Sequence, residues 1–166
     1  AIRGVSILNS YSGNVWYVDS NGAQIGDGKF NRPFATIDTA INHCSAGDII
    51  AVKAGHAETL TTAGQITMDV ASVSIVGLGV GNNRPVLTFT PAAVGTNLVT
   101  WSAANCSFEN IVCVAGFDAM TNPFNISGAN AYLDIEWQDG SSTIEAETVV
   151  LTTAAADRLN INLKYV

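Results

Sequence analysis

Charged residues are scarce in this chain of 166 residues, since Asp, Glu, Lys and Arg together make up only 13% of it. Seven basic residues are scattered among fourteen acidic ones, which gives a net charge of −7. Binding to a nucleic-acid backbone needs clustered Lys and Arg, so the sequence excludes that class of partner. No run of about 18 apolar residues occurs either, and the sequence therefore predicts no membrane span.

Cysteine and histidine are also rare. The three cysteines, Cys44, Cys106 and Cys113, form neither an even set nor a CxxC pair, so we expect buried free thiols from a reducing compartment. The two histidines, His43 and His56, fall in a predicted helix and after a predicted strand, where we expect structural roles. Residues 1–10 lack the long apolar core of a signal peptide. We expect the protein to be made in a reducing cytosol, and we expect no cofactor.

Four stretches of the chain repeat one pattern: a short apolar strand, a corner of small residues, and a second strand of alternating apolar and polar residues. They span residues 66–79, 98–116, 124–140 and 149–166. Their corners are Ala71-Ser72, Asn105, Asn130 and Asp157, spaced by 33 to 34, then 25, then 27 residues. Periods of about 20 to 50 residues indicate stacked supersecondary units. Because no helix separates these strands, the repeat predicts an all-β parallel β-helix of about four to five coils.

The N-terminal part follows a different pattern. Residues 1–14 form a predicted arm, in which a few apolar residues lie among Gly, Ser and Asn, and residues 15–166 form the predicted β-helix domain. Between about residues 34 and 45, apolar side chains recur at helical spacing and predict one α-helix that Gly47 ends. Residues 48–55 then alternate as the strand of the first coil.

The segment 17–60 also carries a set of motifs. A Gly- and Asp-rich loop precedes a Pro-Phe-x-Thr-Ile helix start, a Gly-Asp pair precedes the first strand, and a Gly and a Glu follow it. These positions are Pro33, Phe34, Thr36, Ile37, Gly47, Asp48, Gly55 and Glu58. The segment resembles the opening of pectate-lyase-like proteins, and the resemblance extends over roughly residues 17–115. It implies a short, single-stranded, right-handed parallel β-helix whose helix caps the apolar end of the first coil.

That resemblance does not specify an activity, because lyases, hydrolases, phage tail spikes and phage capsid-stabilising proteins share it. In the strand at 132–138, alternation places Asp134 and Glu136 on the outer face about 7 Å apart, within the range used by carboxylate pairs in glycoside hydrolysis. Alternating acids on a strand are also typical of a solvated face, which is the interpretation we prefer. The catalytic alternative would use Asp134, Glu136 and Asp139.

Other candidate sites have weaker signals. We predict no metal site, because the Gly- and Asp-rich loop lacks the ligand spacing of a known calcium motif. The weak alternative set of ligands is Asp19, Asn21 and Asp27. Trp101 or Trp137 could serve as a stacking platform for a sugar, although buried core rings are the simpler expectation. No helix pattern follows the Gly-rich run 77–83, so we assign it to the exit of a coil and not to a phosphate loop.

Size is the main guide to function. At about 25 residues per coil, residues 48–166 leave room for four to five coils that rise about 4.8 Å each. Catalytic members of the pectate-lyase-like family, which this sequence resembles, typically stack more coils and place their substrate in a long lateral groove. We also expect the last strand, residues 158–166, to leave an apolar layer uncovered, which another subunit would cover.

The resemblance and the small size together favour a structural virion protein. In that role a homotrimer would act as a capsid cement (decoration) protein of a tailed phage, bound to the major capsid protein on the capsid surface. The expected contacts are Ile2, Val5, Ile7, Leu8, Leu159, Ile161, Leu163 and Val166. The alternative is a carbohydrate-active β-helix, as in a fragment of a tail spike, polysaccharide lyase or hydrolase, or a sugar-binding module.

Overall fold

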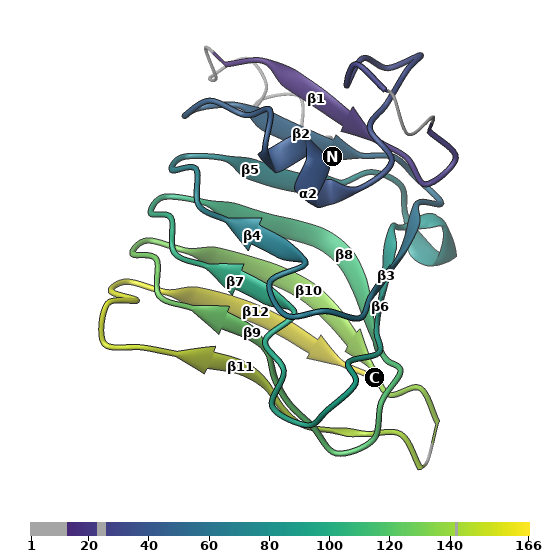
Figure 1. Cartoon of the computed structure of the whole chain (residues 1–166), viewed down its shortest axis with the longest axis vertical. Coiled ribbons are helices and arrows are strands. Elements are labelled where there is room, and N and C mark those ends of the chain that lie inside the picture. The colour runs from purple at the N-terminus through teal and green to yellow at the C-terminus, as the bar shows by residue number, and fades with distance from the viewer. Residues whose placement is uncertain (1–12, 23–25, 142) are drawn as a thin grey trace.

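The computed structural model describes residues 13–22, 26–141 and 143–166. Over these residues the chain is a mostly-β solenoid of about four turns with one short α-helix (Figure 1), which confirms the predicted fold class. The strands are β1 (Val15–Val18), β2 (Ile49–Val52), β3 (Ala57–Leu60), β4 (Ile66–Met68), β5 (Ser74–Gly77), β6 (Val86–Phe89), β7 (Val99–Trp101), β8 (Ser107–Ala115), β9 (Met120–Ile126), β10 (Tyr132–Gln138), β11 (Ala146–Thr152) and β12 (Asn160–Tyr165). The helical elements are α2 (Ile37–Ile41) and the 3-10 turn η1 (Gly81–Asn83).

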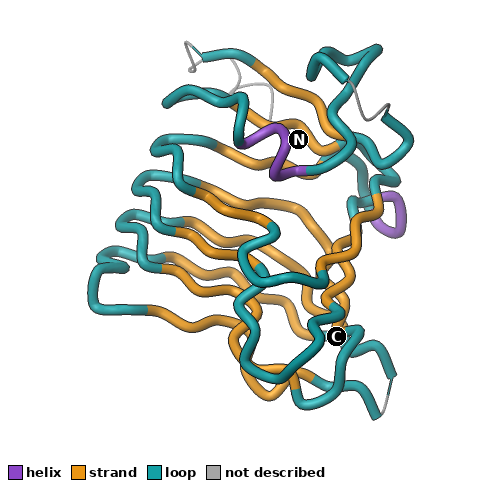
Figure 2. Tube along the Cα trace, in the orientation of Figure 1, coloured by secondary structure: helices purple, strands orange, loops and turns teal. Residues whose placement is uncertain are grey.

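The named strands of the described chain all pair in parallel. A large sheet runs in the order β1-β2-β5-β8-β10-β12, with β3 and β6 beside it, and a small sheet runs in the order β11-β9-β7-β4. Figure 1 shows the small sheet in front of the large one, and Figure 2 shows the turns stacked at the sides of the strand columns. The long strand β8 pairs first with β5 and then with β6, so the following coils replace two short strands by one.

A residue in the left-handed conformation forms the same corner at five successive levels of the solenoid, two residues before a strand of the large sheet. These residues are Gly47, Ser72, Asn105, Asn130 and Arg158. Asn adopts this conformation at lower cost than most residues, and Nδ2 of Asn130 donates to Oδ1 of Asn105 over 2.8 Å. The predicted corners at Ser72, Asn105 and Asn130 are confirmed. The last corner is Arg158 and not Asp157, because β12 begins at Asn160.

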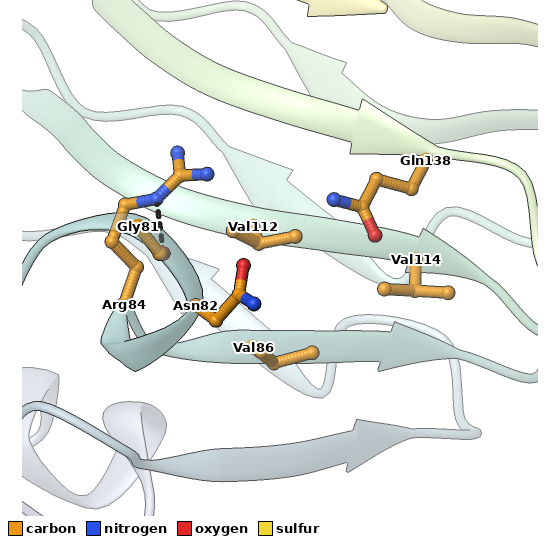
Figure 3. A pocket seen from close by; sticks show the side chains of 7 residues that line it. All are labelled: Gly81, Asn82, Arg84, Val86, Val112, Val114 and Gln138. Carbon is orange, nitrogen blue, oxygen red and sulfur yellow. Dashed lines mark hydrogen bonds between the residues drawn. The ribbon is translucent and has the colours of Figure 1, made fainter. Parts of the chain in front are cut away.

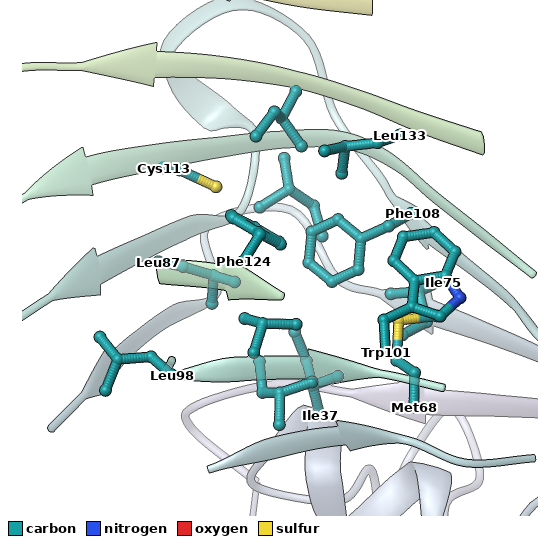
Figure 4. Packing of buried hydrophobic residues seen from close by; sticks show 14 of the residues in the cluster. Ile37, Met68, Ile75, Leu87, Leu98, Trp101, Phe108, Cys113, Phe124 and Leu133 are labelled. Carbon is teal, nitrogen blue, oxygen red and sulfur yellow. The ribbon is translucent and has the colours of Figure 1, made fainter. Parts of the chain in front are cut away.

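The inward-facing side chains of both sheets form one continuous core (Figure 4). Its largest fully buried members are aromatic, with Trp101 1% exposed and Phe89, Phe108, Phe124 and Trp137 0% exposed. The ring centroids of Phe89 and Trp137 lie 5.2 Å apart, and those of Phe108 and Phe124 lie 5.9 Å apart. Aromatic pairs at these separations stabilise a core by roughly 0.5–1.5 kcal/mol beyond the area they bury. The two predicted core Trp residues therefore lie where the alternation of the strands places them.

The N-terminal end of the solenoid is closed by β1 and α2. β1 pairs with β2, and the Asp38 carboxylate of α2 accepts the backbone N–H of Thr67 in β4 over 3.0 Å. Oε2 of Glu58 in β3 accepts the N–H of Ile37 at the start of α2 over 3.1 Å. Strand edges that would otherwise be unpaired are thus satisfied, which is the capping role that the resemblance implied.

The helix α2 is shorter than the predicted helix at about 34–45. Thr36 is extended, and its side chain accepts the N–H of Thr39 as an N-cap. Beyond Ile41, the N–H groups of His43 and Cys44 bond to carbonyls three residues back, so the chain continues in tight turns. Gly47 does not end the helix; it forms the corner that precedes β2.

The C-terminal end of the solenoid is open. Within the described ranges, no strand pairs with the outer edge of β11 or β12. Ile161 and Leu163 lie in register with Leu133 and Ile135 of β10, which are 0% and 2% exposed. Ile161 and Leu163 are nevertheless 39% and 38% exposed, because no further layer covers them there. The terminal layer is the set Leu159, Ile161, Leu163, Tyr165 and Val166.

Candidate functional site

The strand β10 places two of the predicted acidic residues on the outer face of the large sheet. Asp134 and Glu136 alternate there with buried apolar residues, as the sequence predicted. Oδ1 of Asp134 accepts a hydrogen bond from Nδ2 of Asn162 over 2.9 Å. The third acid, Asp139, accepts the hydroxyl of Tyr165 at 2.7 and 2.8 Å, and this bond raises the pKa of Tyr165 to about 12. These contacts join β10 and the turn after it to β12.

Glu136 is the centre of an ion cluster. Its Oε2 accepts hydrogen bonds from Nζ of Lys164 and Nη2 of Arg84, both over 2.8 Å, and its Oε1 accepts Nε2 of Gln138 over 2.7 Å. The bonds from Lys164, Arg84 and Gln138 lower the pKa of Glu136 to about 2. A general acid of a glycosidase needs a raised pKa, so the geometry favours a structural anion at Glu136 over an acid catalyst.

A pocket of about 220 Å³ lies beside this cluster on the outer face of the large sheet. It is lined by Gly81, Asn82, Arg84, Val86, Val112, Val114 and Gln138. The three valines come from outward positions of β6 and β8 and form an apolar floor. Figure 3 shows the amides of Asn82 and Gln138 pointing into the space over Val112, with Arg84 at the rim. We call this site the lateral pocket.

The lateral pocket exists because the second coil carries an outward loop, residues 78–85, between β5 and β6. Gly79 and Gly81 have φ values of 97° and 57°, which let the loop turn away from the sheet. Nε of Arg84 donates to the carbonyl of Gly81 over 3.0 Å and fixes the guanidinium at the pocket rim. The sequence had indicated only a coil exit at 77–83, so this site was missed. The 33-residue spacing of the second coil was the signal for an insertion.

The predicted weak calcium ligands have other partners. Asp19 accepts the N–H of Asn21 over 2.9 Å and lies 3.2 Å from Nζ of Lys53. Burial alone would raise the pKa of Asp19, but these contacts lower it. Asp27 accepts the N–H of Lys29 over 3.1 Å. Among the described residues, no group of three or more His, Cys, Asp or Glu side chains is placed to hold a metal ion.

The two histidines contact polar groups within the protein, and Trp101 and Trp137 are buried. Nδ1 of His43 lies 2.8 Å from the carbonyl of Thr39, and the fully buried His56 lies 3.3 Å from Glu58. Because Trp101 is 1% exposed and Trp137 is 0% exposed, neither ring offers a stacking surface to a sugar.

All three cysteines are free thiols. Cys106 and Cys113 are buried as predicted, whereas Cys44 is only half-buried beside the core. Burial raises the pKa of each thiol, that of Cys44 to about 12. A high pKa keeps a thiol protonated at neutral pH and therefore weakly nucleophilic.

The predicted partner contacts divide into two groups. Leu159 packs partly against the core, while Ile161, Leu163 and Val166 are 39%, 38% and 61% exposed. The arm residues Ile2, Val5, Ile7 and Leu8 lie outside the described residues. Two further exposed apolar side chains near the open end, Tyr165 of β12 and Leu151 of β11, were not among the predicted contacts.

Comparisons with known proteins identify the fold only. No protein-family model and no curated protein matches this chain. A solved structure of a rhamnogalacturonan lyase matches with a TM-score of 0.53 over 84% of this chain at 12% sequence identity. This chain spans 38% of the length of that lyase. The likeness supports the right-handed parallel β-helix, and the resemblance to phage proteins stays a prediction. No helix in the described part of the chain is long and apolar enough to cross a lipid bilayer.

Proposed function

We propose that this chain is a structural assembly protein whose terminal layer is buried against other subunits. The observation that carries the proposal is the contrast between its two ends. β1 and α2 cover the first coil, whereas Ile161, Leu163 and Tyr165 of the last strand are 39%, 38% and 52% exposed. Exposed apolar groups beside open strand edges are typical of interaction or aggregation surfaces.

The magnitude of this burial indicates what kind of contact is needed. Completing the burial of a half-exposed side chain of this size contributes roughly 1 kcal/mol. The four most exposed members of the terminal layer would therefore contribute roughly 4 kcal/mol, close to the lower bound of the roughly 4–15 kcal/mol that association costs. Strand-edge hydrogen bonds, each worth roughly 0.5–1.5 kcal/mol, must add to the contact. A symmetric oligomer that repeats the contact supplies both contributions.

The specific form that we propose is a homotrimeric capsid cement protein on a tailed-phage virion. Its support is the resemblance of residues 17–115 to a family that includes capsid-stabilising proteins, together with the short solenoid. In this role the trimer would bury its apolar surface against the major capsid protein and hold neighbouring shell subunits together.

Sedimentation velocity of the purified chain tests the assembly proposal. We expect a trimer for the natural sequence and a shift towards monomer for Leu163→Asp, because a charge would then have to be buried at the interface. Val80→Asp is the matched control and should leave the trimer intact, since Val80 is 84% exposed in the loop after β5, and β8 and β10 lie between β5 and β12 in the sheet. A natural chain that stays monomeric at all concentrations, and does not bind shells lacking their decoration protein, would contradict the proposal.

A carbohydrate-active or sugar-binding β-helix is the second candidate function. The observations that favour it are the fold likeness to a rhamnogalacturonan lyase and a pocket beside the carboxylates of β10. Incubation with a panel of acidic and neutral polysaccharides, followed by an assay of new chain ends, tests this candidate. Turnover by the natural chain that is lost in the double variant Asp134→Ala, Glu136→Ala would establish it in place of the structural role.

A further inference from the structure

The lateral pocket combines an apolar floor with a rim of polar side chains. Val86, Val112 and Val114 form the floor, and the amides of Asn82 and Gln138 point into the space above it (Figure 3). Pockets that hold drug-sized ligands measure roughly 300–1,000 Å³. At about 220 Å³, the lateral pocket is suited to a group no larger than one side chain or a small metabolite.

Two cationic side chains and one carboxylate meet beside this pocket, in a chain whose net charge is −7. Arg84 and Lys164 both bond to the single carboxylate of Glu136, so two cations share one anion. The carboxylates of Asp134 and Asp139 bond to the neutral groups of Asn162 and Tyr165 and not to Arg84. Glu136 is therefore the one carboxylate paired with Arg84 in the described part of the chain, and a second anion would have to bind at the rest of its guanidinium.

The guanidinium of Arg84 has a donor left for such an anion. Its Nη2 donates to Glu136, and its Nε donates to the carbonyl of Gly81. Among the described residues, Nη1 has no assigned hydrogen-bond partner. Arg84 and Asn82 both lie in the loop of residues 78–85, and the side chains of both residues line the pocket. A planar guanidinium beside an amide donor matches the two oxygens of a carboxylate.

From this arrangement we propose that the lateral pocket binds a carboxylate carried on a short aliphatic chain. The carboxylate lies between Arg84 and Asn82, and the aliphatic chain lies on Val86, Val112 and Val114. The same chemistry occurs in a free short-chain carboxylic acid and in a glutamate side chain of a polypeptide. A neutral polyol fits less well, because the three valines would desolvate its hydroxyl groups without returning hydrogen bonds. This site is independent of the terminal layer and of the assembly proposal.

Titration of the full-length chain with sodium butyrate, followed by two-dimensional NMR of the backbone and side-chain N–H groups, tests the proposal. We expect saturable shifts at the Arg84 Nε–H and at the Asn82 and Gln138 amides. Butyramide, which has the same shape without the charge, should give no such shifts at equal ionic strength. A blocked peptide with one glutamate forms the second arm, and tighter binding of that peptide than of butyrate would identify a polypeptide as the source of the carboxylate.

Two variants make the test specific. Arg84→Lys keeps the ion pair with Glu136 but removes the forked donor, and we expect butyrate to bind at least about fivefold more weakly. Asn82→Ala should weaken binding as well, whereas Asn83→Ala, which alters the adjacent residue outside the pocket lining, should not. Equal shifts with butyramide, tighter binding of galactose than of butyrate, or unchanged binding by Arg84→Lys in a folded protein would overturn the proposal.

Discussion

Replacing Glu136 by Gln tests whether the ion cluster holds β12 to the body of the solenoid. The contacts from Lys164, Arg84 and Gln138 lower the pKa of Glu136 from 4.5 to about 2. A shift of this size corresponds to at most about 3 kcal/mol of stability. Because the side chain of Lys164 is 69% exposed, solvent screening reduces that contribution. We therefore expect Glu136→Gln to lower the free energy of unfolding by about 1–2 kcal/mol at neutral pH.

The pH dependence gives this prediction its sharpest form. The pKa of Glu136 is lower in the folded protein than in the unfolded chain, so its contribution is complete above about pH 4.5 and is lost as the pH falls through about 2. Urea unfolding followed by circular dichroism at about pH 7, 4.5 and 2.5 measures the difference between the natural chain and Glu136→Gln. That difference should shrink towards the lowest pH. Glu147→Gln, an exposed change on β11, is the control and should have a smaller effect. Equal stability of Glu136→Gln and the natural chain at neutral pH would refute the reasoning.

Three further changes test the coil geometry. Arg158→Asn should raise the free energy of unfolding by roughly 0.5–1 kcal/mol in chemical denaturation, because Asn tolerates the left-handed conformation of this corner better than Arg. Asp38→Ala leaves the N–H of Thr67 without its acceptor and should cost roughly 1–3 kcal/mol, with hydrogen exchange of that N–H accelerated. Phe108→Ala empties a fully buried position and should cost roughly 3–5 kcal/mol, measured by the same denaturation.

The sequence predicted the repeat of the coils and the alternation of inward and outward side chains, because both patterns arise among residues that are close together in the chain. The outward positions of Asp134 and Glu136 follow from the two-residue period of one strand, and the structure has them there. The corners at Asn105 and Asn130 were readable because Asn is one of few residues that favour a left-handed conformation. Arg has no such preference for the left-handed conformation, so the sequence placed the last corner at Asp157, one residue before Arg158.

The ion cluster and the lateral pocket could not be read in the same way. Arg84 and Glu136 are 52 residues apart, and whether they meet depends on how many residues of the second coil leave the sheet as a loop. That number is set by the exit at Gly77 and by an extra residue in β8, Asn110, whose Nδ2 donates to the carbonyl of Gly77 over 2.7 Å. Neither feature has a distinctive composition. A Gly-rich loop indicates a turn, but it does not indicate which coil the turn overhangs.

The unequal ends of the solenoid give any docking a direction. β1 and α2 already cover the first coil, so a partner gains little apolar burial there. The open edges of β11 and β12, in contrast, offer unpaired backbone groups together with the exposed apolar side chains of the terminal layer. Each coil contacts mainly its neighbours in a solenoid, so a partner that covers the last coil stabilises β12 first and the other coils only through it. Bound protein should therefore show slowed hydrogen exchange in β12 before any change in β2 or β5. Protection that starts at β1 or α2 instead would place the contact at the capped end and remove the basis of the structural role.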